Sequence, residues 1–183
     1  GEIVGLVGVE GNGQAETLEA IAGLRSIAAG NIKIASQDAT GLSVLERRGL
    51  GLASIPEDRI AEGLATGASV AENLVATKLN DTRYVRNGLL DLKAIKANAT
   101  KLIERFSIRV GGPSYAVGTL SGGNMQKVVV ARELAEQPKL LLVNQPTRGV
   151  DLGATQFIWR TITDAREAGA AVLLSSADLS ELL

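Results

Sequence analysis

Residues 3–23 read IVGLVGVEGNGQAETLEAIAG, which is an apolar run, a glycine-rich turn and an amphipathic segment in succession. The apolar run predicts a strand over 2–7, and the segment after the turn predicts a helix over 14–23. Between them, Gly8 and Gly13 match the phosphate-loop template G-x-x-x-x-G-K-[ST], in which backbone N–H groups and a helix N-terminus hold an anion. The same glycines also suit a tight strand-to-helix turn that binds nothing. Under either interpretation, the strand followed by a turn and a helix is typical of the beginning of an α/β fold.

Only half of the phosphate-loop template is present, because Gln14 replaces its lysine and Ala15 replaces its hydroxyl residue. A neutral hydrogen bond contributes about 1 kcal/mol, against roughly 1.5–3 kcal/mol for one to a charged group. Ala15 offers no oxygen to Mg²⁺, and the Glu16 carboxylate competes with phosphate for the first helical turn. We therefore expect weak nucleotide binding at this loop, whose candidate residues are Gly8, Gly11, Asn12, Gly13, Gln14, Ala15 and Glu16.

Further along the chain, short apolar runs alternate with amphipathic segments, as in a parallel sheet flanked by helices. Strands are predicted over 31–35, 50–55, 140–143 and 171–175. The last two lack alternation, which is typical of central parallel strands. A one-faced helix is predicted over 91–106. Because the stretch 64–119 contains no convincing strand, we predict a helical subdomain inserted into a sheet domain.

The composition limits the chemistry that this chain can perform. It has 183 residues, 45% of them hydrophobic, which suffices for one domain with a sizeable core. It has no Cys and no His, which excludes disulfides, thiolate sites, His-dependent triads and the usual zinc sites. A formal net charge of −1 gives no reason to expect a nucleic-acid partner. The chain starts at Gly1 without a Met and stops at Leu183 in a predicted helix, so we expect a fragment of a longer protein.

A second glycine-rich segment, LSGGNMQK over 120–127, precedes a helix that is predicted to run to about residue 136. Ser121 is a good N-cap, and Gly122 and Gly123 leave backbone amides open, so this helix start is also able to hold an anion. Taken alone, the segment also reads as a capped helix after a loop.

The order of these features resembles the nucleotide-binding domain of ATP-binding cassette (ABC) transporters, over essentially the entire chain. The resemblance rests on the phosphate loop, the helical insertion, Leu120-Ser121-Gly122-Gly123, and the apolar strand that ends before Pro146-Thr147. It implies a single domain over 1–183, with an α/β phosphate-loop core from 1–63 and 120–183. A small antiparallel β portion around 31–55 and a helical subdomain over 64–119 complete the expected fold.

The resemblance also implies that this domain's own nucleotide site is degenerate. Asn144 and Gln145 stand where the family has an Asp for Mg²⁺ and a Glu that activates water, and neither amide takes up a proton. Glu57 replaces the family's glutamine, Ser176 replaces its switch histidine, and Asp151 is retained. We expect ATP as the ligand, with Mg²⁺ mainly at a partner's site and no metal site here.

In this family two domains pack head to tail, so the resemblance implies that Ser121, Gly122 and Gly123 act in trans on the partner's ATP, with no catalytic residue in cis. The expected partners are another ABC nucleotide-binding domain, within the same full-length chain, and transmembrane permease subunits. The sequence is most similar to second domains of bacterial importers for simple sugars or nucleosides at two places, Gly11-Asn12-Gly13-Gln14 and residues 146–151. Such a domain is cytoplasmic, peripheral on the inner face of the membrane, and hydrolyses little or no ATP alone.

Three alternatives remain open at this point. The chain is a decayed duplicate without a role, or a nucleotide-binding regulatory module that does not hydrolyse ATP, or a soluble ABC ATPase that is not linked to transport. The near-neutral charge disfavours a nucleic-acid enzyme among the last group.

Overall fold

The computed structural model describes residues 1–9 and 11–178. The chain divides into two compact units. The first, which we call the sheet unit, comprises Gly1–Glu57, Glu136–Arg148 and the chain from Trp159 onward. The second, the helical unit, comprises Asp58–Ala135 and Gly149–Ile158.

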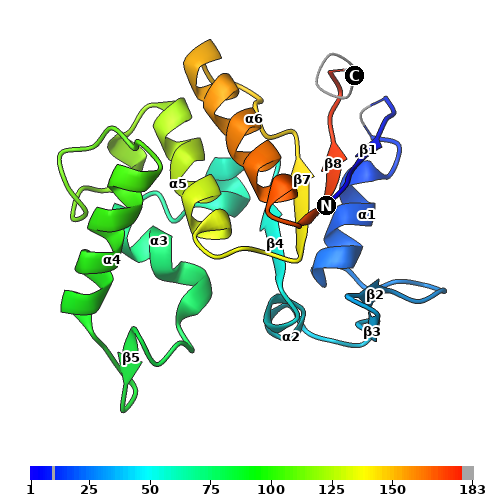
Figure 1. The fold of residues 1–183 in the computed structure, drawn as a ribbon, viewed down its shortest axis with the longest axis horizontal. Helices are drawn as coiled ribbons and strands as arrows, with labels where there is room; N and C mark the ends of the chain where they lie inside the picture. The colour runs from blue at the N-terminus through cyan, green and yellow to red at the C-terminus, as the bar shows by residue number, and fades with distance from the viewer. Residues whose placement is uncertain (10, 179–183) are drawn as a thin grey trace. The chain divides into compact units, whose positions relative to one another are not determined.

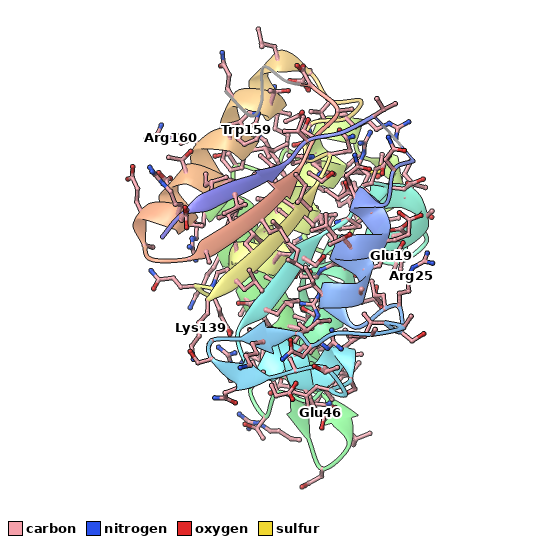
Figure 2. The ribbon with its side chains drawn as sticks, turned by 90° about the vertical axis from the view of Figure 1, so that its right-hand side faces the viewer. Glu19, Arg25, Glu46, Lys139, Trp159 and Arg160 are labelled. Atoms are coloured by element: carbon pink, nitrogen blue, oxygen red, sulfur yellow. The ribbon has the colours of Figure 1, made fainter. Side chains whose placement is uncertain are left out.

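The sheet unit is built on four parallel strands in the order β1 (Ile3–Leu6), β8 (Ala171–Ser175), β7 (Leu140–Asn144) and β4 (Leu52–Ile55), seen side by side in Figure 2. Leu6 and Asn144 both pair with Ser175, and Ile55 pairs with Val143. The carboxyl ends of all four strands therefore lie at one edge of the sheet. β7 and β8 are the inner strands, as their unbroken apolar sequences predicted.

Helix α1 (Gln14–Ala22) lies beside this sheet (Figure 1) and contributes Leu18 and Ala22 to its core. These side chains pack with Ile34, Leu52 and Leu142. The helix ends at Gly23, whose φ of 86° is the left-handed conformation that glycine adopts without strain. The predicted strand–loop–helix unit is therefore confirmed, with the loop at the carboxyl edge.

The antiparallel portion is smaller than the predicted 31–55. It consists of β2 (Lys33–Ile34) and β3 (Gln37–Asp38), joined by a turn at Ala35 and Ser36, both with positive φ. Residues 44–49 form helix α2 (Val44–Gly49), because Ser43 and Glu46 make a capping box at its start. The strand predicted at 50–55 joins the parallel sheet as β4.

The helical unit begins with η1 (Arg59–Gly63), a π-helical turn, followed by α3 (Val70–Val75) and the 3₁₀ turn η2 (Ala76–Lys78). Helix α4 (Leu92–Arg105) confirms the prediction for 91–106, and Asp91 caps it through the Ala94 N–H. After η3 (Val117–Thr119), helix α5 (Gly122–Leu134) packs against α3 and α4. Helix α6 (Leu152–Glu167) starts in this unit and continues in the sheet unit.

The expectation that 64–119 contains no strand is wrong, because β5 (Val85–Arg86) and β6 (Leu89–Leu90) form a short antiparallel pair there. Asn87 and Gly88 connect them with φ of 51° and 77°. Both central residues of a type I′ turn have positive φ, and Asn-Gly is its preferred sequence. The segment 64–119 lies wholly in the helical unit, and its limits as a functional subdomain stay a prediction.

In the described part of the chain, no helix combines the length and apolar character needed to cross a bilayer.

Candidate functional site

The parallel sheet brings most of the predicted site residues to one edge. The glycine-rich loop follows β1, Glu57 follows β4, Asn144 ends β7 and is followed by Gln145, and Ser176 follows β8. Since the carboxyl ends of parallel strands share an edge, these residues line it in the strand order β1, β8, β7, β4. Ser121, Gly122, Gly123 and Asp151 belong instead to the helical unit.

The glycine-rich loop has the backbone of an anion cradle. Gly11 and Gly13 have φ of 89° and 96°, and a methyl group at either would meet no atom within 4 Å. Gly13 precedes α1, and its carbonyl oxygen accepts hydrogen bonds from the Thr17 N–H (2.9 Å) and Oγ1 (2.7 Å). Among the described residues no side chain caps this helix start. Its N-terminal amides are therefore exposed to an incoming anion.

Gln14 changes the interior of this loop. Its Nε2 donates to the Val9 carbonyl oxygen at 3.2 Å. A methyl group at Gly8 would lie 2.1 Å from the same nitrogen, so the carboxamide lies directly against the Gly8 backbone. An anion entering the loop must displace this amide or accept its second N–H. Ala15, half-buried, and Glu16, exposed in the first turn, add no positive charge.

At the end of β7 an amide faces a carboxylate. The Asn144 Nδ2 donates to the Glu57 Oε2 at 3.4 Å, and the Glu57 Oε1 forms an ion pair with Arg148. No group of three or more His, Cys, Asp or Glu in the described residues is arranged to hold a metal ion. With Asn144 donating, Glu57 paired to a cation and no hydroxyl at Ala15, the donor set does not fit Mg²⁺.

Gln145 and Ser176 are bonded to the chain that leaves β8. Gln145 has a φ of 47°, its N–H donates to the Ser175 carbonyl at 2.9 Å, and its Oε1 accepts from the Ala177 N–H at 3.2 Å. Ser176 is buried, and its Oγ accepts from the Asp178 N–H at 3.0 Å. The Gln145 carboxamide oxygen therefore accepts one hydrogen bond from the backbone, and an amide does not take up a proton at neutral pH.

In the helical unit, Ser121 caps α5 as predicted. Its Oγ accepts from the Asn124 N–H (3.5 Å) and from the Asn124 Nδ2 (2.9 Å). The Asn124 Oδ1 accepts in turn from the Arg109 N–H at 2.8 Å. Both contacts to Ser121 use lone pairs of its hydroxyl, which leaves the O–H able to donate to an anion.

Gly122 and Gly123 also have a packing requirement. A methyl group at Gly122 would lie 2.8 Å from the Arg59 Nη2 and 3.3 Å from the Gly149 carbonyl oxygen. One at Gly123 would lie 2.8 Å from the Asp151 Oδ2 and 2.9 Å from the Ala154 Cβ. The two glycines therefore allow the segment 149–154 to pack closely against them, in addition to leaving their amides open. The sequence analysis predicted only the open amides.

Asp151 caps the start of α6, since its Oδ1 accepts from the Ala154 N–H at 2.9 Å. Beside it lies a cavity of about 170 Å³. The lining comes from the loop after α4, the first two turns of α5, and the start of α6 with the residue before it: Arg109, Gly123, Asn124, Lys127, Asp151, Gly153 and Ala154. The Lys127 Nζ donates to the Ser107 carbonyl at 3.1 Å and lies 4.6 Å from the centre of the Phe157 ring. Sequence reasoning did not select Arg109 or Lys127.

A protein-family model described as "ABC transporter" matches residues 1–148 of this chain. The chain is 40% identical over 183 residues to the nucleoside import ATP-binding protein NupA of Lactococcus lactis, covering 100% of this chain and 36% of that protein. It is 42% identical over 185 residues to the glucose import ATP-binding protein TsgD13 of Haloferax volcanii, covering 100% of this chain and 34% of that protein. The ribose import ATP-binding protein RbsA 2 of Streptomyces coelicolor is 39% identical over 183 residues, covering 100% and 35%.

The chain thus spans about a third of the length of the curated relatives that it matches. Among solved structures it resembles the dimeric post-hydrolysis state of the ATP-binding cassette MJ0796 bound to ADP and Pi, with a TM-score of 0.80 and 21% identity. That match covers 98% of this chain and 76% of the other. At this identity the likeness shows the fold alone, and it confirms the predicted α/β cassette.

Proposed function

This chain belongs to the ABC transporter family, and from that premise we propose that it is one nucleotide-binding domain of a longer ATP-binding protein that energises the import of simple sugars or nucleosides. In this proposal its own nucleotide site is degenerate. Its Ser121–Gly123 segment completes the ATP site of a partner domain in a head-to-tail dimer. The names of the relatives support the import of sugars or nucleosides, and the share of their length that the chain covers supports one domain of several.

The observation that carries this proposal is the contrast between two anion-binding helix starts in one chain. At the start of α1 the Gln14 carboxamide lies in the loop, hydrogen-bonded to Val9. At the start of α5 the Ser121 hydroxyl is held by Asn124 with its O–H able to donate. A site that is filled by its own side chain binds phosphate weakly, whereas an oriented hydroxyl beside open amides is ready to meet it.

Hydrolysis at this domain's own site is expected to be slow or absent. A positioned general base contributes about 10² to 10⁴-fold, and the Gln145 amide cannot accept a proton at neutral pH. Its oxygen also accepts the Ala177 N–H. When Mg²⁺ and ATP are bound by the partner domain, the metal neutralises phosphate charge there, and this chain supplies the Ser121 hydroxyl and the amides of Gly122 and Gly123.

Asp151 contributes to the same face in this proposal. Its carboxylate caps α6 and lies against Gly123, which fixes the loop that crosses to the partner. The partners are then a second nucleotide-binding domain and transmembrane permease subunits, with no nucleic acid. The domain would accordingly lie on the cytoplasmic side of the bacterial cell membrane, attached to its inner face through the permease.

The test is Ser121→Arg in the full-length protein assembled with its permease. The arginine places bulk and charge where the hydroxyl meets the partner's phosphate, so we expect ATP hydrolysis and solute uptake to fall to background. Ser114→Arg is the matched control, since Ser114 is an exposed loop residue of the same unit. Wild-type hydrolysis and uptake in the Ser121→Arg protein would refute the trans-acting function.

A titration with ATP separates this proposal from a regulatory module that binds without turnover. The degenerate site is expected to bind ATP only at millimolar concentration, with little dependence on Mg²⁺. Saturation at micromolar ATP would favour the regulatory module.

A further inference from the structure

Arg59 lies between two loops of the helical unit that the proposed function uses. Its Nη2 donates to the Gly149 carbonyl oxygen at 3.1 Å. The same nitrogen would lie 2.8 Å from a methyl group at Gly122. The same guanidinium nitrogen is therefore close to both Gly149 and Gly122, one residue from each of the two loops. We infer that Arg59 is a positioning residue that fixes these two loops in the arrangement required to meet a partner's nucleotide, an inference that rests on the proposed function.

The backbone that carries Arg59 is anchored at both ends. Asp58 precedes η1, and its Oδ1 accepts from the N–H groups of Ile60 (2.8 Å) and Ala61 (3.0 Å). At the other end the Gly63 carbonyl accepts from the Arg132 Nη1 at 2.8 Å. Arg132 is buried on α5 and also bonded to Glu133. The turn is thus attached to the helix whose N-terminus carries Ser121, so the guanidinium projects from a fixed base.

Two contacts together fix the segment 149–151 against α5. Arg59 bonds to the carbonyl of Gly149, the first residue of the segment. The Oδ2 of Asp151, its last residue, lies against Gly123. Gly149 has a φ of 67°, which presents its carbonyl at little conformational cost.

The position of the Arg59 guanidinium also favours a glycine at position 122. A methyl group at Gly122 would lie 2.8 Å from the Arg59 Nη2, so the guanidinium would have to shift away and its hydrogen bond to the Gly149 carbonyl would be weakened. Arg59 and Gly122 are then coupled, and their substitutions are not independent. A residue that merely stabilised the unit from elsewhere would show no such coupling.

The experiment is a double-mutant cycle on the ATP hydrolysis of the full-length protein assembled with its permease, with Arg59→Met, Gly122→Ala and the double variant. We expect Arg59→Met alone to lower kcat about tenfold. Gly122→Ala should lower kcat about tenfold in the wild-type background but only about twofold in the Arg59→Met background, because the nitrogen that the new methyl group meets is gone. The KM for ATP should stay within about twofold in all three, since the partner holds the nucleotide.

Arg59→Lys provides the conservative variant, because an ammonium keeps the bond to Gly149 without the planar group over Gly122. We expect it to recover more than half of the lost kcat, and Gly122→Ala should cost less kcat in this background than in the wild type. Arg160→Met is the matched control: Arg160 lies on the outer side of α6 in Figure 2 and is exposed. If thermal unfolding shows that Arg59→Met does not fold, the cycle is completed with Arg59→Lys, and Gly122→Ala must then cost less kcat in the Arg59→Lys background than in the wild type.

Two results would overturn the inference: a Gly122→Ala cost that is equal in both backgrounds, or Arg59→Met activity equal to that of Arg160→Met. The proposed function fails separately, through an active Ser121→Arg protein. An inactive Ser121→Arg protein together with an additive cycle would reject the positioning by Arg59 alone.

Discussion

Replacing Gln14 with lysine is expected to tighten ATP binding at the glycine-rich loop without starting hydrolysis. The Gln14 carboxamide now lies against Gly8 and donates to the Val9 carbonyl at 3.2 Å. A lysine stem follows the same path, because Gly8 has no Cβ to obstruct it. Its ammonium then supplies the positive charge that the loop lacks.

The magnitude follows from the exchange of one hydrogen bond for another. The variant loses a neutral bond to Val9 of about 1 kcal/mol and gains a charge-assisted bond to phosphate of roughly 1.5–3 kcal/mol. The net gain of about 0.5–2 kcal/mol corresponds to binding tighter by about 2- to 30-fold. Glu16, in the first turn of α1, opposes part of this gain through its own negative charge. Under the proposed function we expect no hydrolysis in this variant either, because the Gln145 amide does not take up a proton.

Isothermal titration of ATP against the full-length wild-type protein, Gln14→Lys and Gln14→Met measures this change. Under the proposed function, a substitution in the partner domain's phosphate loop first blocks the partner's ATP site. Gln14→Met is the matched control, since it removes the amide but adds no charge. It should bind no more than about threefold tighter than wild type. Equal affinity of the lysine and wild-type proteins would refute the idea that a missing cation limits binding at this loop.

Three further predictions concern hydrogen bonds and ion pairs that stabilise the two units. Arg47 is buried and donates to four backbone carbonyls, two of them in the last turn of α1, so Arg47→Met should lower the free energy of unfolding by about 3–5 kcal/mol in urea titrations. Hydrogen bonds from the Ser69 hydroxyl, and then from its N–H, hold the pKa of Glu72 below its ordinary value. The stabilisation that these bonds give is present near neutral pH and is lost as the pH falls through the folded pKa. The difference in unfolding free energy between wild type and Glu72→Gln should therefore shrink from pH 6 to pH 3. Asn144→Asp alone should destabilise the sheet unit, because the new carboxylate would lie about 3.4 Å from that of Glu57. Adding Glu57→Gln should restore the midpoint of unfolding. A destabilisation that persists in the double variant would contradict this.

The sheet was predictable because its signals are local. The runs at 140–143 and 171–175 are apolar without alternation, and the structure buries them as inner strands. The Asn87-Gly88 turn was visible in the sequence, yet the flanking strands are two residues each, too short for a periodic pattern. The capping box of Ser43 and Glu46 was likewise readable and would have separated α2 from the strands around it.

The contacts that define the candidate sites were much less predictable, because they join distant parts of the chain. Arg59 is 90 residues from Gly149, and no periodicity relates them. Residue types led to the prediction that Gln14, Asn144 and Gln145 are neutral substitutes at a nucleotide site, and this stays a prediction. They did not indicate that Gln14 would bond to Val9, or that the Gln145 oxygen would accept the Ala177 N–H. Spacing predicts which groups share an edge, whereas the direction of a side chain depends on packing that only the folded chain defines.

The polar side chains at the carboxyl ends of β4, β7 and β8 have partners within the chain, which bears on how the domain stays folded without a ligand. Asn144 donates to Glu57, Glu57 pairs with Arg148, and Ser176 accepts from the backbone. A buried or half-buried polar group that has a hydrogen-bond partner within the chain does not need a ligand to satisfy it, so the fold at this edge does not require one. A domain with an edge of this kind can hold its Ser121–Gly123 segment ready whether or not its own loop carries ATP. Under the proposed function, closure of the dimer would then depend on the partner's nucleotide alone.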